Sequence, residues 1–91
     1  METKLAAGPA VGDRVFVRAV THYYTGRIEA MDDQWIRLGD AAWIADTGRF
    51  STALVSGALS EVEPYPGVCF VARGAIVDLS PWAHALPREQ K

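Results

Sequence analysis

The chain has 91 residues, with 9 basic and 11 acidic side chains and a formal net charge of -2 at pH 7. This length supports one small domain with one modest core and excludes a large multidomain enzyme. The near balance of charge excludes a strong overall attraction to nucleic acid or to a membrane surface, so any such binding must be local.

The compartment is indicated by the cysteine content and by the absence of long apolar runs. The single cysteine, Cys69, lies in the apolar run VCFVA, which favours a buried reduced thiol over a disulfide. No apolar run has the length of a membrane span, and METKLAAGPAVGD at the start lacks the apolar segment of a secretory signal. We therefore expect a soluble cytoplasmic protein.

The domain organisation is predicted from glycine and proline positions. Residues 1–12 form an N-terminal segment, in which residues 1–7 are compatible with a short helix before glycine and proline interrupt it. A β-barrel domain is expected over residues 13–80, and a tail over residues 81–91.

The first predicted strand is DRVFVRAV, residues 13–20. Its alternation places Val15 and Val17 on one face and Phe16 on the other, together with Arg14 and Arg18. This pattern is typical of a half-buried strand whose second face is solvated.

Two further strands are predicted from YYTGRIEAM, residues 23–31, and WIRLGDAAWI, residues 35–44. Gly26 within the earlier one indicates a sharp bend, as small barrels require. Ile36 and Leu38 are expected to point inward. The three strands would follow one another as an antiparallel meander.

The segment from Asp46 to Gly67, DTGRFSTALVSGALSEVEPYPG, has a different pattern, because Phe50 and Leu54 recur at helical spacing. We expect a short helix within an insertion at residues 46–66, between the third and fourth strands.

The last two predicted strands are VCFVA, residues 68–72, and RGAIVDL, residues 73–79. The tail carries Trp82 and Leu86 between two prolines and is expected to lie across the barrel or a neighbouring subunit before it ends in solvent. The fold class is therefore mostly β: five short, strongly bent antiparallel strands in a small barrel, whose closure would hide the sheet edges.

Two stretches of the sequence resemble the motifs of a known protein family. GDRVFVRAVTHYYTGRIEAMDDQWIRLGDAAWI, residues 12–44, resembles the first motif of the Sm-like (LSm/Hfq-like) family: a Val-x-Val strand, Tyr-x-Gly-x-Ile, an Asp-containing turn, and Ile-x-Leu followed by Asp-Ala. VARGAIVDL, residues 71–79, resembles the second motif, an apolar strand that enters Arg-Gly before another apolar strand. Together they cover roughly half of the chain in the family's order.

The resemblance implies a five-stranded SH3-type barrel whose subunits pair edge to edge into a homo-oligomeric ring. It also implies that single-stranded RNA is held near the central pore by two turns. Carried over residue by residue, the RNA-binding positions are Asp32, Asp33, Gln34, Trp35, Arg73 and Gly74. In these positions the ring of Trp35 would stack on a base, Gln34 or Asp33 would pair with a base edge, and Arg73 would attract phosphate or stack on a base plane.

The same residues also have purely structural interpretations. Asp32 and Asp33 are ordinary turn formers, because Asp side chains bond to nearby backbone amides. Trp35 could pack at a subunit contact, and Arg73 with Gly74 could be a bend that carries a solvated charge.

No set of residues with catalytic or metal-binding spacing is found. The Asp pair has no third group for acid–base work, and His22 and His84 have no ligand companion at suitable spacing. We expect neither an enzyme nor a cofactor, and surface or hydrogen-bonded roles for both histidines.

A second function hypothesis is a Sm-like ring that acts only as a structural or protein-interaction module. The insertion at residues 46–66 favours it, since a helix with exposed Phe50 and Leu54 would offer a docking surface to a protein partner.

Overall fold

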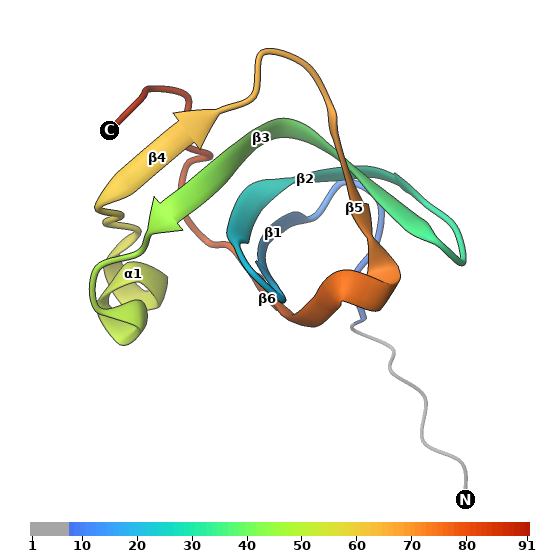
Figure 1. Cartoon of the computed structure of the whole chain (residues 1–91), viewed down its shortest axis with the longest axis horizontal. Coiled ribbons are helices and arrows are strands. Elements are labelled where there is room, and N and C mark those ends of the chain that lie inside the picture. The colour runs from blue at the N-terminus through green and yellow to red at the C-terminus, as the bar shows by residue number, and fades with distance from the viewer. Residues whose placement is uncertain (1–7) are drawn as a thin grey trace, which may run out of the picture.

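The computed structural model describes residues 8–91, and the short helix expected within residues 1–7 lies outside them. The described chain is mostly β, with one antiparallel sheet of six strands, one short α-helix and one 3-10 turn (Figure 1). The elements are β1 (Arg14–Ala19), β2 (Tyr23–Met31), β3 (Trp35–Asp46), α1 (Phe50–Ser56), β4 (Glu61–Pro64), β5 (Cys69–Ala72), η1 (Arg73–Ala75) and β6 (Ile76–Pro81).

The strand order is β4-β3-β2-β1-β6, and β5 also pairs with β3. The first half of β3 pairs with β5 and its second half pairs with β4, so that, with β2, β3 has three strand partners (Figure 1). Within residues 8–91 the end strands β4 and β6 do not pair with each other, so the sheet is not closed into a barrel.

The expected number of five strands is wrong by one. The additional strand, β4, lies inside the segment that was expected to be an insertion. Its sequence, EVEP, has only Val62 as an inward apolar residue between two exposed glutamates, which is too short an alternation to be recognised as a strand. The helix predicted in the same segment is confirmed as α1.

The hydrophobic core consists of two clusters on the two faces of β1. The first cluster contains Val15, Val17, Ile28, Ile36, Leu38, Ala41, Cys69 and Val71. The second cluster contains Phe16, Ala42, Ile44, Ala53, Leu59, Val62 and Trp82. The expected burial of Cys69 is confirmed, and its thiol forms no disulfide.

The expected solvation of the Phe16 face of β1 is wrong. Phe16 is 0% exposed, and its ring centroid lies 5.6 Å from that of Trp82 in a stacked arrangement. The ring of Phe50 lies 5.8 Å from it on another side. Helix α1 and the C-terminal segment therefore cover a strand face that the arginines at positions 14 and 18 had suggested was solvated.

Strand β3 contributes to both clusters because its alternation changes at a bend. Leu38 and Ala41 belong to the first cluster, whereas Ala42 and Ile44 belong to the second. Asp40, which lies between Leu38 and Ala41 just before this change, has a positive φ of 47°, a left-handed conformation that L residues other than Asn and Asp rarely adopt. The bend turns the second half of the strand toward α1.

Gly26 lies opposite this bend, where β2 approaches β3 closely. A Cβ atom at this position would lie 2.8 Å from the Cβ atom of Leu38, which is closer than carbon atoms pack. The β2–β3 pairing also shifts register between Thr25 and Arg27. This agrees with the bend that glycine in the strand had indicated.

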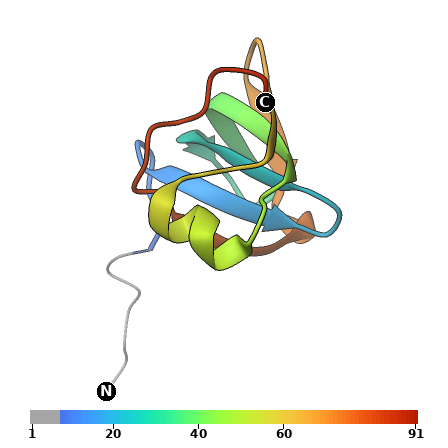
Figure 2. The ribbon, with the colours of Figure 1, turned by 90° about the vertical axis from the view of Figure 1, so that its left-hand side faces the viewer.

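The C-terminal segment lies across the domain, as predicted, but its last residue is paired. Arg88 donates from Nη1 to the carbonyl of Ala41 at 2.8 Å and from Nη2 to that of Tyr65 at 2.9 Å. Lys91 and Val62 exchange both backbone hydrogen bonds, at 2.9 and 3.0 Å, along the outer edge of β4. The segment and α1 lie at the end of the molecule opposite the β2–β3 turn (Figures 1 and 2).

Helix α1 spans seven residues and ends at Ser56; Gly57 follows it as the C-cap, with a left-handed φ of 78° that suits glycine. Among residues 8–91, no helix has the length and apolar character needed to cross a membrane.

Candidate functional site

The two turns singled out from the sequence are in direct contact. The backbone N–H of Arg73 donates to the carbonyl of Gln34 at 2.8 Å, and its guanidinium Nη1 donates to the carbonyl of Asp32 at 2.7 Å. The β2–β3 turn and η1 therefore lie side by side although they are far apart in sequence. All six predicted site residues are gathered in these two turns: Asp32, Asp33, Gln34, Trp35, Arg73 and Gly74.

Asp32 organises the β2–β3 turn. Its Oδ1 accepts hydrogen bonds from the backbone N–H groups of Gln34 and Trp35, both at 2.8 Å, and its own N–H donates to the carbonyl of Trp35 at 3.0 Å. These backbone donors lower the pKa of the Asp32 carboxyl below its ordinary value of 3.8. The structural interpretation of Asp32 therefore holds, because its carboxylate is engaged within the turn.

Two exposed aromatic rings lie beside the turns. Trp35 is 45% exposed and Phe70 is 57% exposed, and their ring centroids are 6.4 Å apart at an interplanar angle of 85°. Met31 is also exposed next to them, and a shallow hollow of about 120 Å³ lies between these side chains. We call the following set the turn surface: Met31, Asp32, Asp33, Gln34, Trp35, Phe70, Arg73 and Gly74.

Phe70 and Met31 were missed by the sequence reasoning. VCFVA is one continuous apolar run in the sequence, whereas in the structure Cys69 and Val71 point inward and Phe70 points outward on β5. The period of two along a strand was the available signal, because it separates Phe70 from its two neighbours. Met31 ends β2 and no pattern distinguished it.

Charges around the turn surface are nearly balanced. The Nε atom of Arg37 lies 3.3 Å from Oε1 of Glu29, so that arginine already has an acidic partner. Arg73 is the other nearby cation, and it lies next to Asp32 and the exposed Asp33. The surface therefore has aromatic and hydrogen-bonding character but no excess of positive charge.

Gly74 occupies an unconstrained position. Nothing lies within 4 Å of a Cβ atom built on it, and its φ is not in the left-handed region. The chain therefore does not need glycine here to form η1.

Helix α1 offers less docking surface than expected. Leu54 is partly buried and packs against the second cluster. Phe50 keeps 37% of its surface exposed, but its ring also packs against Phe16 and Tyr23. Val55, which is 81% exposed, is the most exposed large apolar residue of the helix.

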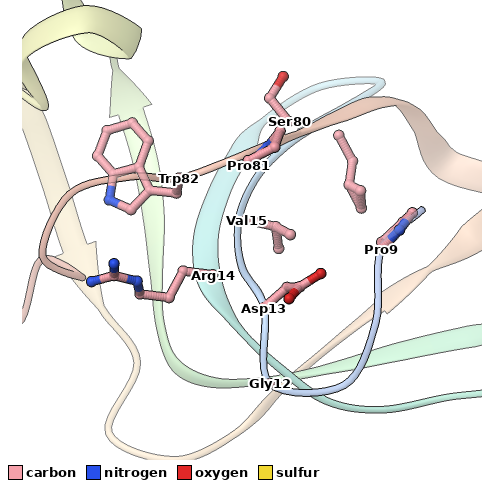
Figure 3. A pocket seen from close by; sticks show the side chains of 9 residues that line it. Pro9, Gly12, Asp13, Arg14, Val15, Ser80, Pro81 and Trp82 are labelled. Carbon is pink, nitrogen blue, oxygen red and sulfur yellow. The ribbon is translucent and has the colours of Figure 1, made fainter. Parts of the chain in front are cut away.

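A larger cavity of about 460 Å³ lies beside the start of β1 and the end of β6 (Figure 3). Asp13 uses Oδ2 to accept from the N–H of Ala10 at 3.0 Å, which closes the loop that forms one wall. The side chains of Asp13 and Arg14 point to opposite sides of the chain (Figure 3). None of the predicted site residues lines this cavity.

Within residues 8–91, no group of three His, Cys, Asp or Glu side chains could hold a metal ion. His22 Nδ1 lies 2.6 Å from the hydroxyl of Thr21, and His84 Nε2 lies 2.8 Å from the carbonyl of Leu54. Both histidines are thus hydrogen-bonded, as expected.

Comparisons with protein-family models, with curated proteins and with solved structures find no match for this chain. The resemblance to Sm-like proteins therefore rests on the motifs of residues 12–44 and 71–79.

Proposed function

We propose that this chain is a Sm-like module that forms a homo-oligomeric ring and binds single-stranded RNA at the turn surface, near the pore of that ring. The observation that carries the proposal is the contact between Arg73 and the β2–β3 turn, which holds the two motif turns together next to exposed Trp35 and Phe70.

The chemistry of the turn surface suits unpaired bases. The exposed rings of Trp35 and Phe70 offer stacking surfaces that any base can use. The side-chain amide of Gln34 can pair with a base edge. Arg73 keeps guanidinium donors in addition to the Nη1 that holds the turn, and these can contact phosphate.

The balanced charge of the turn surface determines how RNA would be held. Few phosphates would be neutralised at each subunit, so affinity would come from stacking and from repetition of the site around a ring. We therefore expect a shallower salt dependence than that of strongly basic RNA-binding proteins.

Open strand edges support the ring. Within residues 8–91, β5 pairs only with β3 and β6 pairs only with β1, so each of them has one edge without a strand partner. Pairing β5 of one subunit with β6 of the next would cover both edges by a head-to-tail contact that can close into a ring. The outer edge of β4 is in part occupied already, because Val62 pairs with Lys91.

Two measurements test the proposal. Light scattering should give a mass that is a multiple of the 9.9 kDa subunit. Fluorescence anisotropy with a short labelled single-stranded RNA should show binding that Phe70→Ala and Trp35→Ala each weaken by roughly tenfold, the expected loss for one stacked base. Val55→Ala, on α1, is the matched control and should bind normally. Full affinity in both aromatic variants would remove the turn surface as the RNA site.

The second candidate function is a ring that acts as a protein-interaction module without RNA. The observation that favours it is the composition of the turn surface, because Trp, Phe, Met and Arg are enriched in the cores of protein interfaces. In this case the RNA would not bind, and Phe70→Asp would abolish capture of a protein partner or lower the mass of the assembly.

A further inference from the structure

A second group of aromatic side chains lies at the opposite end of β3 from the turn surface. It lines an open groove of about 370 Å³, which we call the aromatic groove. Its residues are His22, Tyr24, Trp43, Glu63, Pro64 and Tyr65. None of them belongs to the turn surface.

Strand pairing sets the order of these side chains. Tyr24 pairs with Trp43 across β2 and β3, and Trp43 pairs with Glu63 across β3 and β4. Paired residues project to the same face of a sheet, so the three form a row across three strands. The ring of His22 lies 5.1 Å from Trp43 at one side of the row, and the ring of Tyr65 lies 6.5 Å from Tyr24.

Core packing accounts for two of these four rings, those of Tyr24 and Tyr65, but not for those of Trp43 and His22. Trp43 and His22 belong to neither hydrophobic cluster, and both remain half-exposed. Tyr24 and Tyr65 pack against the first cluster, and this packing holds their rings in place. The N–H of Tyr65 also donates to the carbonyl of Ala41 at 2.8 Å. The groove is thus held in shape without a ligand.

The charge at the groove is negative on one side. None of its six lining residues is Lys or Arg, and Glu63 is exposed. Arg88 lies beside the groove, since its Nη2 donates to the carbonyl of Tyr65 at 2.9 Å, but its Nε lies 4.0 Å from the carboxylate of Asp40. Oε1 of Glu63 accepts from the amide of Gln90 at 3.1 Å. Glu61 is exposed two residues away on the same face of β4. A ligand that lies along the aromatic row therefore meets carboxylates where the row reaches β4.

We propose that the aromatic groove binds an extended proline-rich peptide segment that carries an arginine or lysine. Proline-rich chains adopt the polyproline II conformation before binding, so they lose little entropy when they dock on aromatic-lined grooves. The rings of Tyr24, Trp43 and Tyr65 provide the platform for proline rings, and Glu63 provides the partner for the cation. Glu61 and Glu63 disfavour a nucleic-acid ligand, because they would repel phosphates.

Titration of the full chain followed by NMR tests the assignment. The probe is a ten-residue peptide that consists of three Pro-Pro-Ala units followed by one arginine. Backbone shifts should be confined to the aromatic groove. A matched peptide with alanine at each proline should bind at least roughly tenfold more weakly, because it must order on binding. A peptide with glutamate in place of the arginine should also bind more weakly, and this difference should shrink with added salt.

Variants in the chain assign the roles. Trp43→Ala should lower affinity by on the order of tenfold or more, as truncation of an aromatic anchor does. Glu63→Gln should bind the arginine and glutamate peptides with about equal affinity. This variant tests the proposal independently of Trp43→Ala if the latter does not fold. Trp35→Ala, in the turn surface, is the control for an aromatic residue outside the groove and should bind the peptide normally.

Three results would overturn the inference: no binding of the proline peptide by the unmodified chain at millimolar concentration, equal binding of the alanine-matched peptide, or shifts centred on the turn surface. A single-stranded RNA that shifts the groove residues would assign the groove to nucleic acid instead. The inference is independent of RNA binding at the turn surface, because the two sites are tested with different probes and variants.

Discussion

The guanidinium of Arg73 donates from Nη1 to the backbone carbonyl of Asp32 at 2.7 Å, and the N–H of the same arginine donates to the carbonyl of Gln34. Through these two bonds, the turn that follows β5 is attached to the turn between β2 and β3. A side chain with candidate binding chemistry thus also has a structural role. Tests of the turn surface must therefore separate loss of binding from loss of the turn.

Arg73→Ala should lower the free energy of unfolding by about 1 kcal/mol, because it removes a charge-assisted hydrogen bond at a partly solvated position. The measurement is urea denaturation. Arg37→Ala is the matched control: its partner is the side chain of Glu29 on the surface, and loss of such a pair should cost about 0.5 kcal/mol or less. Equal effects of the two variants would argue against a structural role for Arg73.

Asp32→Ala should lower the melting temperature, since it removes the acceptor of two backbone N–H groups. The pKa of Asp32 is lowered in the folded chain by these donors, so its contribution to stability is complete above the ordinary value of 3.8 and is lost as pH falls through the folded-state pKa. Asp32→Asn keeps an acceptor oxygen but does not titrate. The difference in melting temperature between wild type and Asp32→Asn should therefore shrink in acid, and a constant difference would contradict the assignment.

Gly26→Ala should destabilise the chain by about 1–3 kcal/mol, because the added methyl group would overlap Leu38 and force β2 away from β3. Gly74→Ala is the matched glycine substitution in open space and should change stability by about 0.5 kcal/mol or less. Thermal denaturation of the two variants measures this difference in stability. If Gly26→Ala were as stable as Gly74→Ala, the close approach of β2 and β3 would not be a constraint.

Trp82→Ala should cost about 3–5 kcal/mol, since it empties the centre of the second cluster next to Phe16. Trp35→Ala, in which an exposed indole is removed, should cost much less. Calorimetry of both variants compares an inward and an outward tryptophan in one chain. Similar losses would mean that Trp35 is buried in solution, for example by a neighbouring subunit.

Tyr65 should titrate in strong base. Burial, together with the neighbouring Cys69 and Tyr24, raises its pKa from 10.0 to about 12. The folded state therefore favours the neutral phenol, and the contribution of Tyr65 to stability is complete below pH 10 and is lost as pH rises through about 12. Absorbance of phenolate should show a late transition that Tyr65→Phe removes. Persistence of that transition in the variant would assign it to another tyrosine.

Local patterns in the sequence were sufficient for much of the fold. Alternation predicted the strands of the meander, the helical spacing of Phe50 and Leu54 predicted α1, and the apolar run around Cys69 predicted its burial. Each of these depends on neighbours within a few residues, because strand and helix periods are properties of the local backbone. The turn-forming role of Asp32 was predicted for the same reason, since its partners lie two and three residues away.

The tertiary structure decided what depends on contacts between distant residues. Phe16 is buried only because Trp82 and α1 reach the same face of β1, which no local pattern of β1 contains. Val62 lies in a strand because β3 bends at Asp40 and offers its second half as a partner. The aromatic groove combines side chains of three strands and the adjoining loops. Burial and pairing are collective properties of the packed chain, so the sequence supplied the candidate residues and the fold determined which of them meet.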